Sequence, residues 1–327
     1  MADLGGVLAL ARQSGPGFTS LPSNEKILAD RLALSDASFQ EKIPVRERWY
    51  TLILEQTDTG EVQGIASVRA AVGTCRPHYS FRIITQSQFS QSAEHFIDHE
   101  LLMLVNECNS WSEVGSLFVK PEARSGGAGR LLSRSRYMLI ASHQELFGET
   151  IMAELRGYFD EEGMSPFWSN VASKFFRLPF HDADGMITGT DGQFLHDLAP
   201  RYPIYVELLP QEARDRINML HPMGEPAFAL LEREGFRKTG LIDIFDAGPT
   251  LACRRDEIAT VRYSTMRRVE ACDDPAGITD LLICNAELEH FRCARMEAAV
   301  DEDAVHLTSF AVDALGVSTG SDVRVCQ

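Results

Sequence analysis

The sequence lacks a long hydrophobic run. No stretch of about 18 consecutive apolar residues occurs, so no membrane-spanning helix is predicted. The N-terminus has no basic leader followed by an apolar segment and a small-residue cleavage site, as a secretory signal would have. We therefore expect a cytoplasmic protein that has no membrane as a partner.

Cysteine pairs at metal-binding or redox spacing are also lacking. The seven cysteines are odd in number, scattered along the chain and free of C-x-x-C pairs. This pattern argues against a disulfide scaffold or a zinc site and favours reduced thiols in a cytoplasm.

Positive charge is scarce relative to negative charge. The 31 Lys and Arg residues against 47 Asp and Glu residues give a formal net charge of −16. Nucleic acids and anionic membranes usually require a basic face, so neither is expected as a partner. An acidic protein is compatible with a cationic substrate, although acidic surfaces more often serve only solubility. The 327 residues, of which 44% are hydrophobic, suffice for one large domain and a small one.

The most informative stretch runs from Ser116 to Ser142. Its short apolar run Leu117–Val119 predicts a strand, a turn follows, and the glycine-rich loop Arg124–Gly129 leads into a segment with helical apolar periodicity. A strand, a glycine loop and a helix in this order form an anion site, because unpaired N–H groups and the helix dipole face the ligand. Glycine lets the backbone approach that ligand closely.

The details of the loop distinguish between kinds of phosphate site. It ends in Gly129-Arg130-Leu131, so it lacks the Gly-Lys-Ser/Thr of a Walker A loop, and it lacks the G-x-G-x-x-G dinucleotide fingerprint. The spacing of Arg124, Gly127 and Gly129 resembles the pyrophosphate loop of the GNAT acyl-CoA transferases. Arg124 and Arg130 are the better candidates for phosphate contacts. The alternative is a glycine-rich turn that only lets a strand reverse into a helix.

A second stretch, Ala227–Phe236, predicts an amphipathic helix closed by Gly235. It resembles the A-x-x-L-Y-E-x-x-G-F helix of the same superfamily, in which the tyrosine often protonates the departing thiolate. Leu231 stands in place of that tyrosine. Another group must therefore act as the acid if the chain is an enzyme.

Apolar periodicity and turn residues predict the other elements. We expect helices at 4–13, 23–39, 93–105, 210–220 and 226–234, and a loop that enters a helix near Ser165-Pro166. Strands are expected at 50–55, 62–68, 79–85, 150–155, 203–209 and 240–245, with a turn at 246–250 and a core role for the aromatic segment 175–180. Past about residue 255 short strands and turns dominate.

Several separated stretches resemble one family. They are Gly17–Pro22, the Arg124 loop with Leu131–Arg136, Ala153–Gly157, Asp160–Gly163, Ser165–Trp168, Tyr202–Tyr205, His221-Pro222, Asp243–Asp246 and Gly248–Thr250. Together and in this order, they resemble the bacterial arginine N-succinyltransferases, a GNAT-related family.

The resemblance implies an α/β fold, a GNAT-like acyltransferase mixed sheet flanked by helices in residues 1–255, with a small C-terminal β-rich module in residues 256–327. It implies transfer of succinyl from succinyl-CoA to the α-amino group of L-arginine, in arginine catabolism. It further implies that His221 is the proton donor and that Leu117 contacts succinyl-CoA. Because the family includes paired, related subunits, the resemblance also implies a homo- or hetero-oligomer.

These implied roles agree with the physical properties of the residues. Backbone groups of a strand over Leu117–Val119 can bind pantetheine amides and hold the oxyanion of a tetrahedral intermediate. His221 lies just before the helix that lost its tyrosine, and histidine suits proton transfer near neutral pH. The alternative is a histidine that only caps or hydrogen-bonds near a helix end.

The guanidinium of arginine requires planar carboxylate partners. Candidates in the family-like segments are Glu154, Asp160, Glu161, Asp243 and Asp246. Spacing alone does not choose between them, and we take Glu154 and Asp246 as the expected pair.

One motif suggests a metal. His95, His99 and Glu100 have the spacing of one helix face, but they lack the H-E-x-x-H order. Direct acyl transfer needs no metal, so we expect none and interpret the motif as a polar helix face. Two other functions stay open: a non-catalytic partner subunit, and an acyltransferase for ornithine or another amine.

Overall fold

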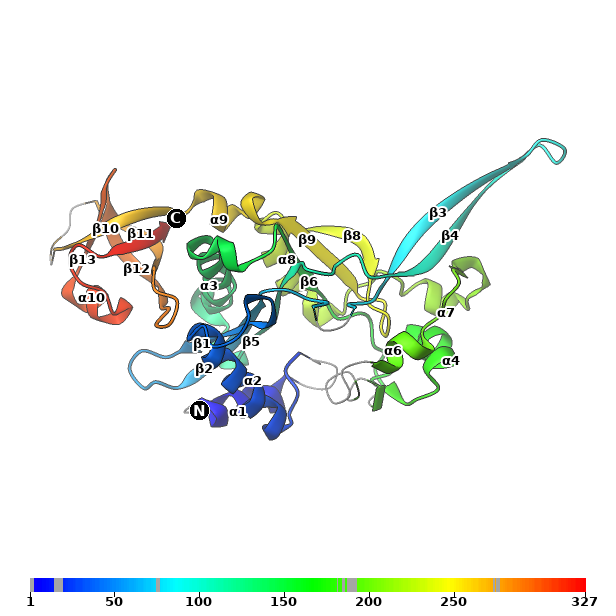
Figure 1. Ribbon diagram of the computed structural model, residues 1–327, viewed down its shortest axis with the longest axis horizontal. Coiled ribbons are helices and arrows are strands. Elements are labelled where there is room, and N and C mark those ends of the chain that lie inside the picture. The colour runs from blue at the N-terminus through cyan, green and yellow to red at the C-terminus, as the bar shows by residue number, and fades with distance from the viewer. Residues whose placement is uncertain are drawn as a thin grey trace.

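The computed structural model describes residues 3–14, 20–74, 77–180, 182–183, 186, 193–272, 274 and 277–327. Cys75 and residues 17–19 of the family-like stretch 17–22 lie outside these residues. The molecule is elongated, with a large mixed sheet in the middle, a small barrel at one end and a projecting two-stranded arm at the other (Figure 1).

Nine strands form the large sheet in the described part of the chain, in the order β1-β2-β5-β6-β9-β8-β3-β4-β7. Neighbouring strands are antiparallel except for the parallel pair β5–β6. The strands are β1 Trp49–Glu55, β2 Val62–Arg69, β3 Ser80–Ser90, β4 His95–Val105, β5 Ser112–Val119, β6 Thr150–Glu154, β7 Ile204–Tyr205, β8 Arg237–Ile242 and β9 Pro249–Arg254.

Helices cover both faces of the sheet around β2. Ile65 packs in one cluster with residues of α1 (Leu4–Gln13) and α2 (Glu25–Phe39), whereas Ala66 packs in another with residues of α3 (Ala128–Ser142). Successive strand residues point to opposite faces, so two covered faces make β2 buried almost throughout. The Asn24 side chain caps α2 by accepting a hydrogen bond from the Ile27 N–H at 3.1 Å, as its sequence predicts.

A separate aromatic cluster covers the other half of the sheet. Phe81 of β3 and Phe245 pack there with Trp168 and Phe176, and the Trp168 and Phe176 rings are stacked 6.0 Å apart. The cluster therefore confirms that the 175–180 segment contributes to the core. The short helices nearby are the π-helix η5 (Trp168–Ala172), α4 (Ser173–Phe176), α6 (Gln193–Leu198) and α7 (Gln211–Arg214).

The C-terminal residues form a closed barrel with its own core. Its strands are β10 Thr265–Ala271, β11 Thr279–Asn285, β12 Cys293–Val300, β13 Ala304–Leu307 and β14 Asp322–Cys326, in the order β10-β13-β12-β11-β14. Val269, Ile283 and Val323 are fully buried inside it. The helix α10 (Ser309–Leu315) belongs to the barrel, and α9 (Ala259–Tyr263) precedes it. The expected β module is thus present.

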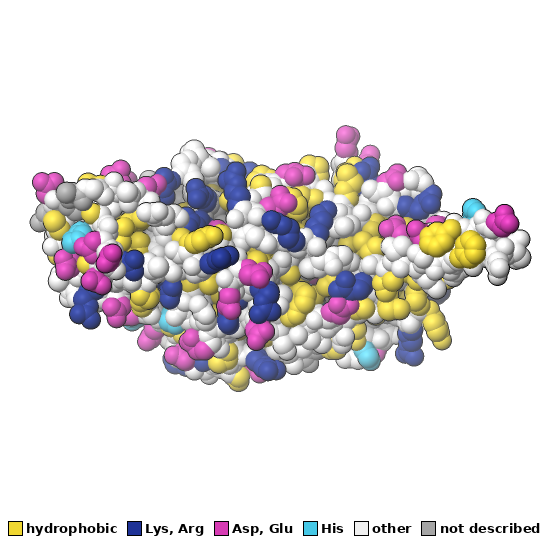
Figure 2. Space-filling model, turned by 90° about the horizontal axis from the view of Figure 1, so that it is seen from above, with side chains coloured by type: hydrophobic (Ala, Val, Ile, Leu, Met, Phe, Trp, Pro, Cys, Tyr) yellow, Lys and Arg dark blue, Asp and Glu magenta, His cyan; other side chains and the backbone are white. Residues whose placement is uncertain are grey.

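The prediction of a helix at 93–105 is wrong. Residues 95–105 form β4, which pairs with β3 from Ser80↔Val105 to Ser90↔His95. A turn with Glu94 at φ 48° reverses the chain, and pairing with β3 buries Leu101 and Leu102, so tertiary contacts override local helical spacing. The outer part of this hairpin is the arm, on which Figure 2 shows hydrophobic side chains; Phe89 and Phe96 are 65% and 60% exposed.

Three other expectations need correction. The helix at 210–220 shrinks to α7, because Asn218 has φ 59° and its N–H donates to the Ala247 carbonyl. The strand at 203–209 shrinks to β7, followed by a 3-10 turn. The strand at 240–245 lies instead at 237–242, and Pro249 starts β9 where only a turn was expected.

No helix in the described residues is long and apolar enough to span a membrane.

Candidate active site

The parallel strands β5 and β6 separate in the middle of the sheet. They pair only at Ser112↔Ile151 and Glu113↔Met152. Beyond this point β5 stays with β2, and its register shifts between Ser67↔Gly115 and Ile65↔Phe118. The shift is a β-bulge, in which Ser116 takes a left-handed φ of 51°. We use the word wedge for the point where the pairing of β5 with β6 ends, next to Leu117 and Val119, the expected acyl-CoA contacts.

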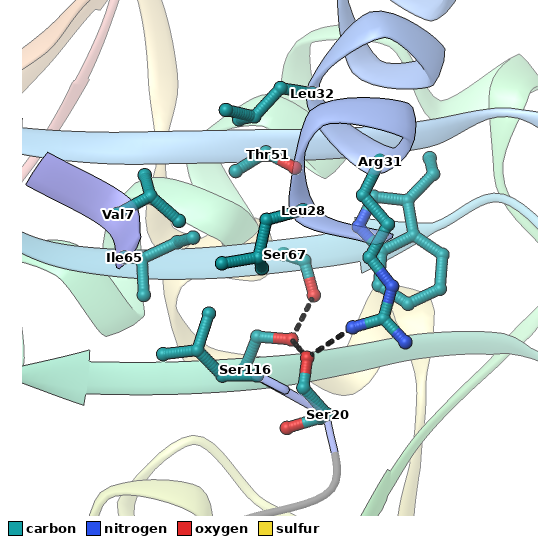
Figure 3. Close-up of a pocket in the computed structure, with 11 residues that line it drawn as sticks. Val7, Ser20, Leu28, Arg31, Leu32, Thr51, Ile65, Ser67 and Ser116 are labelled. Carbon is teal, nitrogen blue, oxygen red and sulfur yellow. Dashed lines mark hydrogen bonds between the residues drawn. The ribbon is translucent and has the colours of Figure 1, made fainter. Parts of the chain in front are cut away.

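A small cavity lies on the face of the sheet that α1 and α2 cover, and hydrogen bonds beside it hold the bulge in position (Figure 3). The Ser67 hydroxyl donates to the Ser116 Oγ at 3.1 Å, and the Ser116 hydroxyl donates to the Ser20 carbonyl at 3.1 Å. The cavity measures about 20 Å³, room for about one water molecule. It is therefore too small for a substrate, and its hydrogen bonds serve the conformation of β5.

The glycine loop follows β5 and opens α3. Gly126 and Gly127 have left-handed φ values of 71° and 85°, and no side chain caps the helix. A Cβ added to Gly126 or Gly129 would meet no atom within 4 Å among the described residues. The space beside Gly126 and Gly129 at the start of α3 is thus open, as an anion site at a helix N-terminus requires. A Cβ on Gly127, in contrast, would lie 3.1 Å from Nη1 of Arg295.

Arginines surround this loop. Arg124 is exposed, and its Nε donates to the Val119 carbonyl at 3.1 Å. Arg130 is exposed and lines a cavity of about 170 Å³ between α3, α9 and α8 (Glu225–Arg233), together with Arg134 and Arg233. Arg295 of the barrel donates to the Gly126 carbonyl at 3.2 Å. The sequence contained no signal for Arg295, because 169 positions separate the two residues.

His221 lies in the turn before α8, next to the residues that follow β6. Its backbone N–H donates to the Arg156 carbonyl at 2.9 Å, and its Nδ1 accepts from the Met223 N–H at 3.1 Å. Because Nδ1 uses its lone pair, neutral His221 carries its proton on Nε2. Burial and then the charge of Arg156 lower the pKa of His221. The His221 side chain therefore caps the turn through Nδ1, and its Nε2 stays available for proton transfer.

Asp246 ties the end of β6 to the β8–β9 turn. Its carboxylate accepts the N–H groups of Gly157 at 2.9 Å and Gly248 at 2.8 Å. Asp243 accepts those of Phe245 and Asp246 at 2.7 and 2.9 Å. Burial raises the pKa of Asp246, and burial together with the Asp246 charge raises that of Asp243 well above its usual range. Backbone groups thus occupy both oxygens of Asp246.

Glu154 at the end of β6 pairs with His78, whose Nε2 lies 3.0 Å from Oε1. Burial by itself disfavours both charges, but mutual attraction outweighs it. The pKa of His78 rises to about 9, and that of Glu154 falls. Sequence reasoning missed His78, since only the fold brings together residues 76 positions apart.

For the other expected carboxylates, the structure gives no side-chain contact with this group among the described residues. Asp160 closes its own loop by accepting the Met164 N–H at 2.7 Å, and Glu161 is exposed. The suggested metal motif lies on β4, where His99 is 3.5 Å from Glu207. Four positions along a strand separate His95 from His99 by about 13 Å. The described residues contain no group of three or more His, Cys, Asp or Glu side chains that could hold a metal.

Sequence reasoning also missed Arg156, although it lies in the family-like stretch Ala153–Gly157. Its guanidinium lies over the Phe159 ring, 4.2 Å from the ring centre. The His221 ring centre is 6.5 Å from that of Phe159. Arg156, Phe159 and His221 thus form one group beside the two pairs His78–Glu154 and Asp243–Asp246.

Comparison with known proteins covers the whole chain. The family model described as arginine N-succinyltransferase beta subunit matches residues 1–260, and the model of its C-terminal domain matches residues 266–326. The arginine N-succinyltransferases of Salmonella schwarzengrund and Salmonella agona are each 38% identical over 327 residues, which is 100% of this chain and 95% of each relative. The chain belongs to the arginine N-succinyltransferase family.

A solved structure agrees with this membership. The arginine/ornithine succinyltransferase subunit AI from Pseudomonas aeruginosa superposes with a TM-score of 0.88 at 34% identity, and the match covers 99% of this chain and 95% of that one. The family resemblance noted in the sequence is therefore confirmed. In this member of the arginine N-succinyltransferase family, the glycine loop, the wedge and His221 belong to one continuous fold.

Proposed function

We propose that this protein is an arginine N-succinyltransferase, which transfers succinyl from succinyl-CoA to the α-amino group of L-arginine in arginine catabolism. The observation that carries the proposal is the 38% identity to proteins of that name over all 327 residues. The open helix start, the wedge and the buried carboxylates give each part of such a reaction a physical basis.

The proposed site of succinyl-CoA is GNAT-like. Its diphosphate lies on the amides at the start of α3, with Gly127 and Gly129 allowing close approach and Arg124 and Arg130 supplying charge. The pantetheine arm enters the wedge along Leu117 and Val119. The bulge at Ser116, the separation of β5 from β6 and the left-handed loop glycines support this placement.

Transfer is proposed to be direct. The neutral α-amino group attacks the thioester carbonyl, and N–H groups near Leu117–Val119 stabilise the oxyanion. A base takes the extra proton of the attacking nitrogen, so that a neutral amide forms. When the C–S bond breaks, Nε2 of protonated His221 gives its proton to the thiolate of coenzyme A. In this charged form Nδ1 also carries a proton, so the hydrogen bond from the Met223 N–H belongs to the neutral ring. The lowered pKa of His221 favours that donation, since it makes the imidazolium a stronger acid. The reaction needs no metal.

Glu154 and Asp246 are the proposed carboxylates for the substrate guanidinium. Oε1 of Glu154 contacts His78 and leaves Oε2 for a substrate. Both oxygens of Asp246 already accept backbone N–H groups, so a guanidinium there would use the remaining lone pairs. Glu154 is therefore the more direct of the two.

We also propose that the protein acts in the cytoplasm, without nucleic acid or membrane, as a homo- or hetero-oligomer with a related subunit. The projecting arm supports oligomerisation, because a two-stranded hairpin is marginal alone in water and its Phe89 and Phe96 are exposed. The P. aeruginosa relative is itself titled a subunit.

A thiol-release assay tests the activity. The isolated chain is mixed with succinyl-CoA and L-arginine, and free coenzyme A is followed over time; the expected result is arginine-dependent release. Ornithine is the second amine to test, since the solved relative is titled an arginine/ornithine succinyltransferase. If release requires a related subunit, the chain is a partner subunit instead. If calorimetry detects no binding of succinyl-CoA, the proposed enzyme is ruled out.

A further inference from the structure

Arg156 is held in a rigid backbone position at the end of β6. The Leu155 N–H donates to the Pro249 carbonyl at 3.1 Å, and the Arg156 carbonyl accepts the His221 N–H at 2.9 Å. The next residue, Gly157, donates to the Asp246 carboxylate at 2.9 Å. With the chain fixed on both sides, the guanidinium has a defined direction.

Among the described residues, no hydrogen-bond acceptor is found for the guanidinium. It lies over the Phe159 ring at 4.2 Å, and its Nε is buried without a hydrogen-bond partner among the described residues. The negative charge of Asp246 acts on it, but both oxygens of that carboxylate already accept backbone N–H groups of Gly157 and Gly248. A partly buried guanidinium stays charged at neutral pH and is stabilised most by a planar anion that accepts two parallel N–H bonds.

The surroundings indicate where such an anion lies. Arg156 and His221 both lie beside the Phe159 ring, with the guanidinium 4.2 Å and the imidazole centre 6.5 Å from the ring centre. The charge of Arg156 also lowers the pKa of His221. His221 is the residue proposed to protonate the leaving sulfur. The succinyl group carries a carboxylate two methylenes from its reacting carbonyl, and arginine carries one on the carbon that bears its reacting nitrogen. Either carboxylate would lie within a few atoms of the reacting centre.

We propose that Arg156 is the carboxylate receptor of this site, which binds either the free carboxylate of the acyl group or the α-carboxylate of the amino acid through its unpaired N–H donors above Phe159. The inference rests on the proposed function and deepens it, because it identifies a residue that determines specificity. Arg156 then selects a dicarboxylic acyl group, or an amino acid over a simple amine.

The test is the substrate preference of Arg156→Met in the full chain. The values of kcat/KM are measured with succinyl-CoA and with butyryl-CoA, in which a methyl replaces the carboxylate. They are then measured with L-arginine and with argininamide, in which an amide replaces the carboxylate. Each preference is a ratio within one protein, so a general loss of folded enzyme cancels from it. A receptor for the carboxylate gives a preference that falls by about 10- to 100-fold in the variant.

Two further variants complete the experiment. Arg156→Lys keeps a charge over Phe159 but not the planar fork, so its preference falls by less than that of Arg156→Met; it carries the test if Arg156→Met fails to fold. Arg216→Met is the matched control, because Arg216 stacks on Tyr158 at 3.9 Å in the same part of the molecule. Its preferences stay at the wild-type values.

The outcomes distinguish the acyl carboxylate from the amino-acid carboxylate, and the proposed role of Arg156 from the proposed function. A fall confined to the succinyl-to-butyryl ratio assigns Arg156 to the acyl carboxylate, and a fall confined to the arginine-to-argininamide ratio assigns it to the amino acid. Wild-type ratios in both Arg156 variants, with an active wild-type enzyme, overturn the inference. Inactivity of the wild-type chain toward succinyl-CoA and arginine is a failure of the proposed function instead.

Discussion

Glu154→Gln is expected to lower the pKa of His78 and to destabilise the protein at pH 6 much more than at pH 10. The carboxylate of Glu154, 3.0 Å from His78, outweighs the effect of burial and raises the pKa of His78 from the ordinary 6.5 to about 9. The difference corresponds to about 3 kcal/mol of stability at 1.36 kcal/mol per pKa unit.

The pH window follows from the two partners. The contribution of His78 is fully present below pH 6.5 and is lost as the pH rises through about 9. The pKa of Glu154 is lowered, so its contribution is present above the ordinary value of 4.5 and is lost as the pH falls through the lowered pKa. At pH 6 the intact pair stabilises the fold, and at pH 10 a neutral His78 leaves little of that stabilisation.

Two measurements check this expectation. NMR titration of the histidine rings gives the midpoint for His78, which is assigned as the signal that disappears in His78→Gln. Urea unfolding of the wild type and of Glu154→Gln gives the difference in free energy at pH 6 and pH 10. Asp301→Asn is the matched control, because Asp301 also contacts a histidine, His306, at 2.9 Å, but on the surface, where solvent screens the pair.

A His78 midpoint below 7 in the wild type would refute the reasoning. So would a midpoint that Glu154→Gln leaves unchanged, or an equal loss of stability at both pH values.

Four further changes test other parts of the structure. Gly157→Ala adds a Cβ that overlaps the Asp246 carbonyl oxygen, so overpacking is expected to cost about 1–3 kcal/mol in denaturant unfolding; unchanged stability would contradict the packing. Gly127→Ala forces a side chain into φ 85° at a cost of about 1–2 kcal/mol, and calorimetry should show weaker succinyl-CoA binding. Asn24→Ala removes the α2 cap and should lower stability by about 1 kcal/mol without changing thiol release. His221→Asn keeps a side-chain acceptor for the Met223 N–H but lacks the imidazole, so kcat should fall by about 10²- to 10⁴-fold with the fold intact; wild-type turnover would leave His221 only its capping role.

Local signals predicted the parts of the fold that local physics determines. Asn24 before an apolar helical pattern located the start of α2, and two adjacent glycines after an apolar run located the loop before α3. Both features depend on a few neighbouring residues, through a cap and through left-handed backbone. The C-terminal β-rich module was predicted from short strands between turns, whereas its closure into a barrel and its strand order depend on long-range pairing.

The errors lie where pairing decides the conformation. Residues 95–105 have apolar positions compatible with a helix, and only the presence of β3 makes them a strand. Pro249 suggested a turn, but it occupies the first position of β9, where a missing N–H costs least. The same reason limits prediction of the site: His221 carried a motif, whereas His78, Arg156 and Arg295 acquire their meaning from residues distant in sequence.

Leu231, at the position where the similar GNAT helix carries a tyrosine, connects the fold with the proposed chemistry. Leu231 is 4% exposed and packs in the same core cluster as Phe236. A side chain in this position faces apolar neighbours, and a hydroxyl there would need a hydrogen-bond partner. The helix α8 therefore contributes packing, and the turn just before it contributes His221, whose ring caps that turn through Nδ1 and leaves Nε2 for a proton. The proposed acid also lies next to Arg156, since the two residues share a backbone hydrogen bond. One short segment thus links the proposed proton donor to the proposed carboxylate receptor.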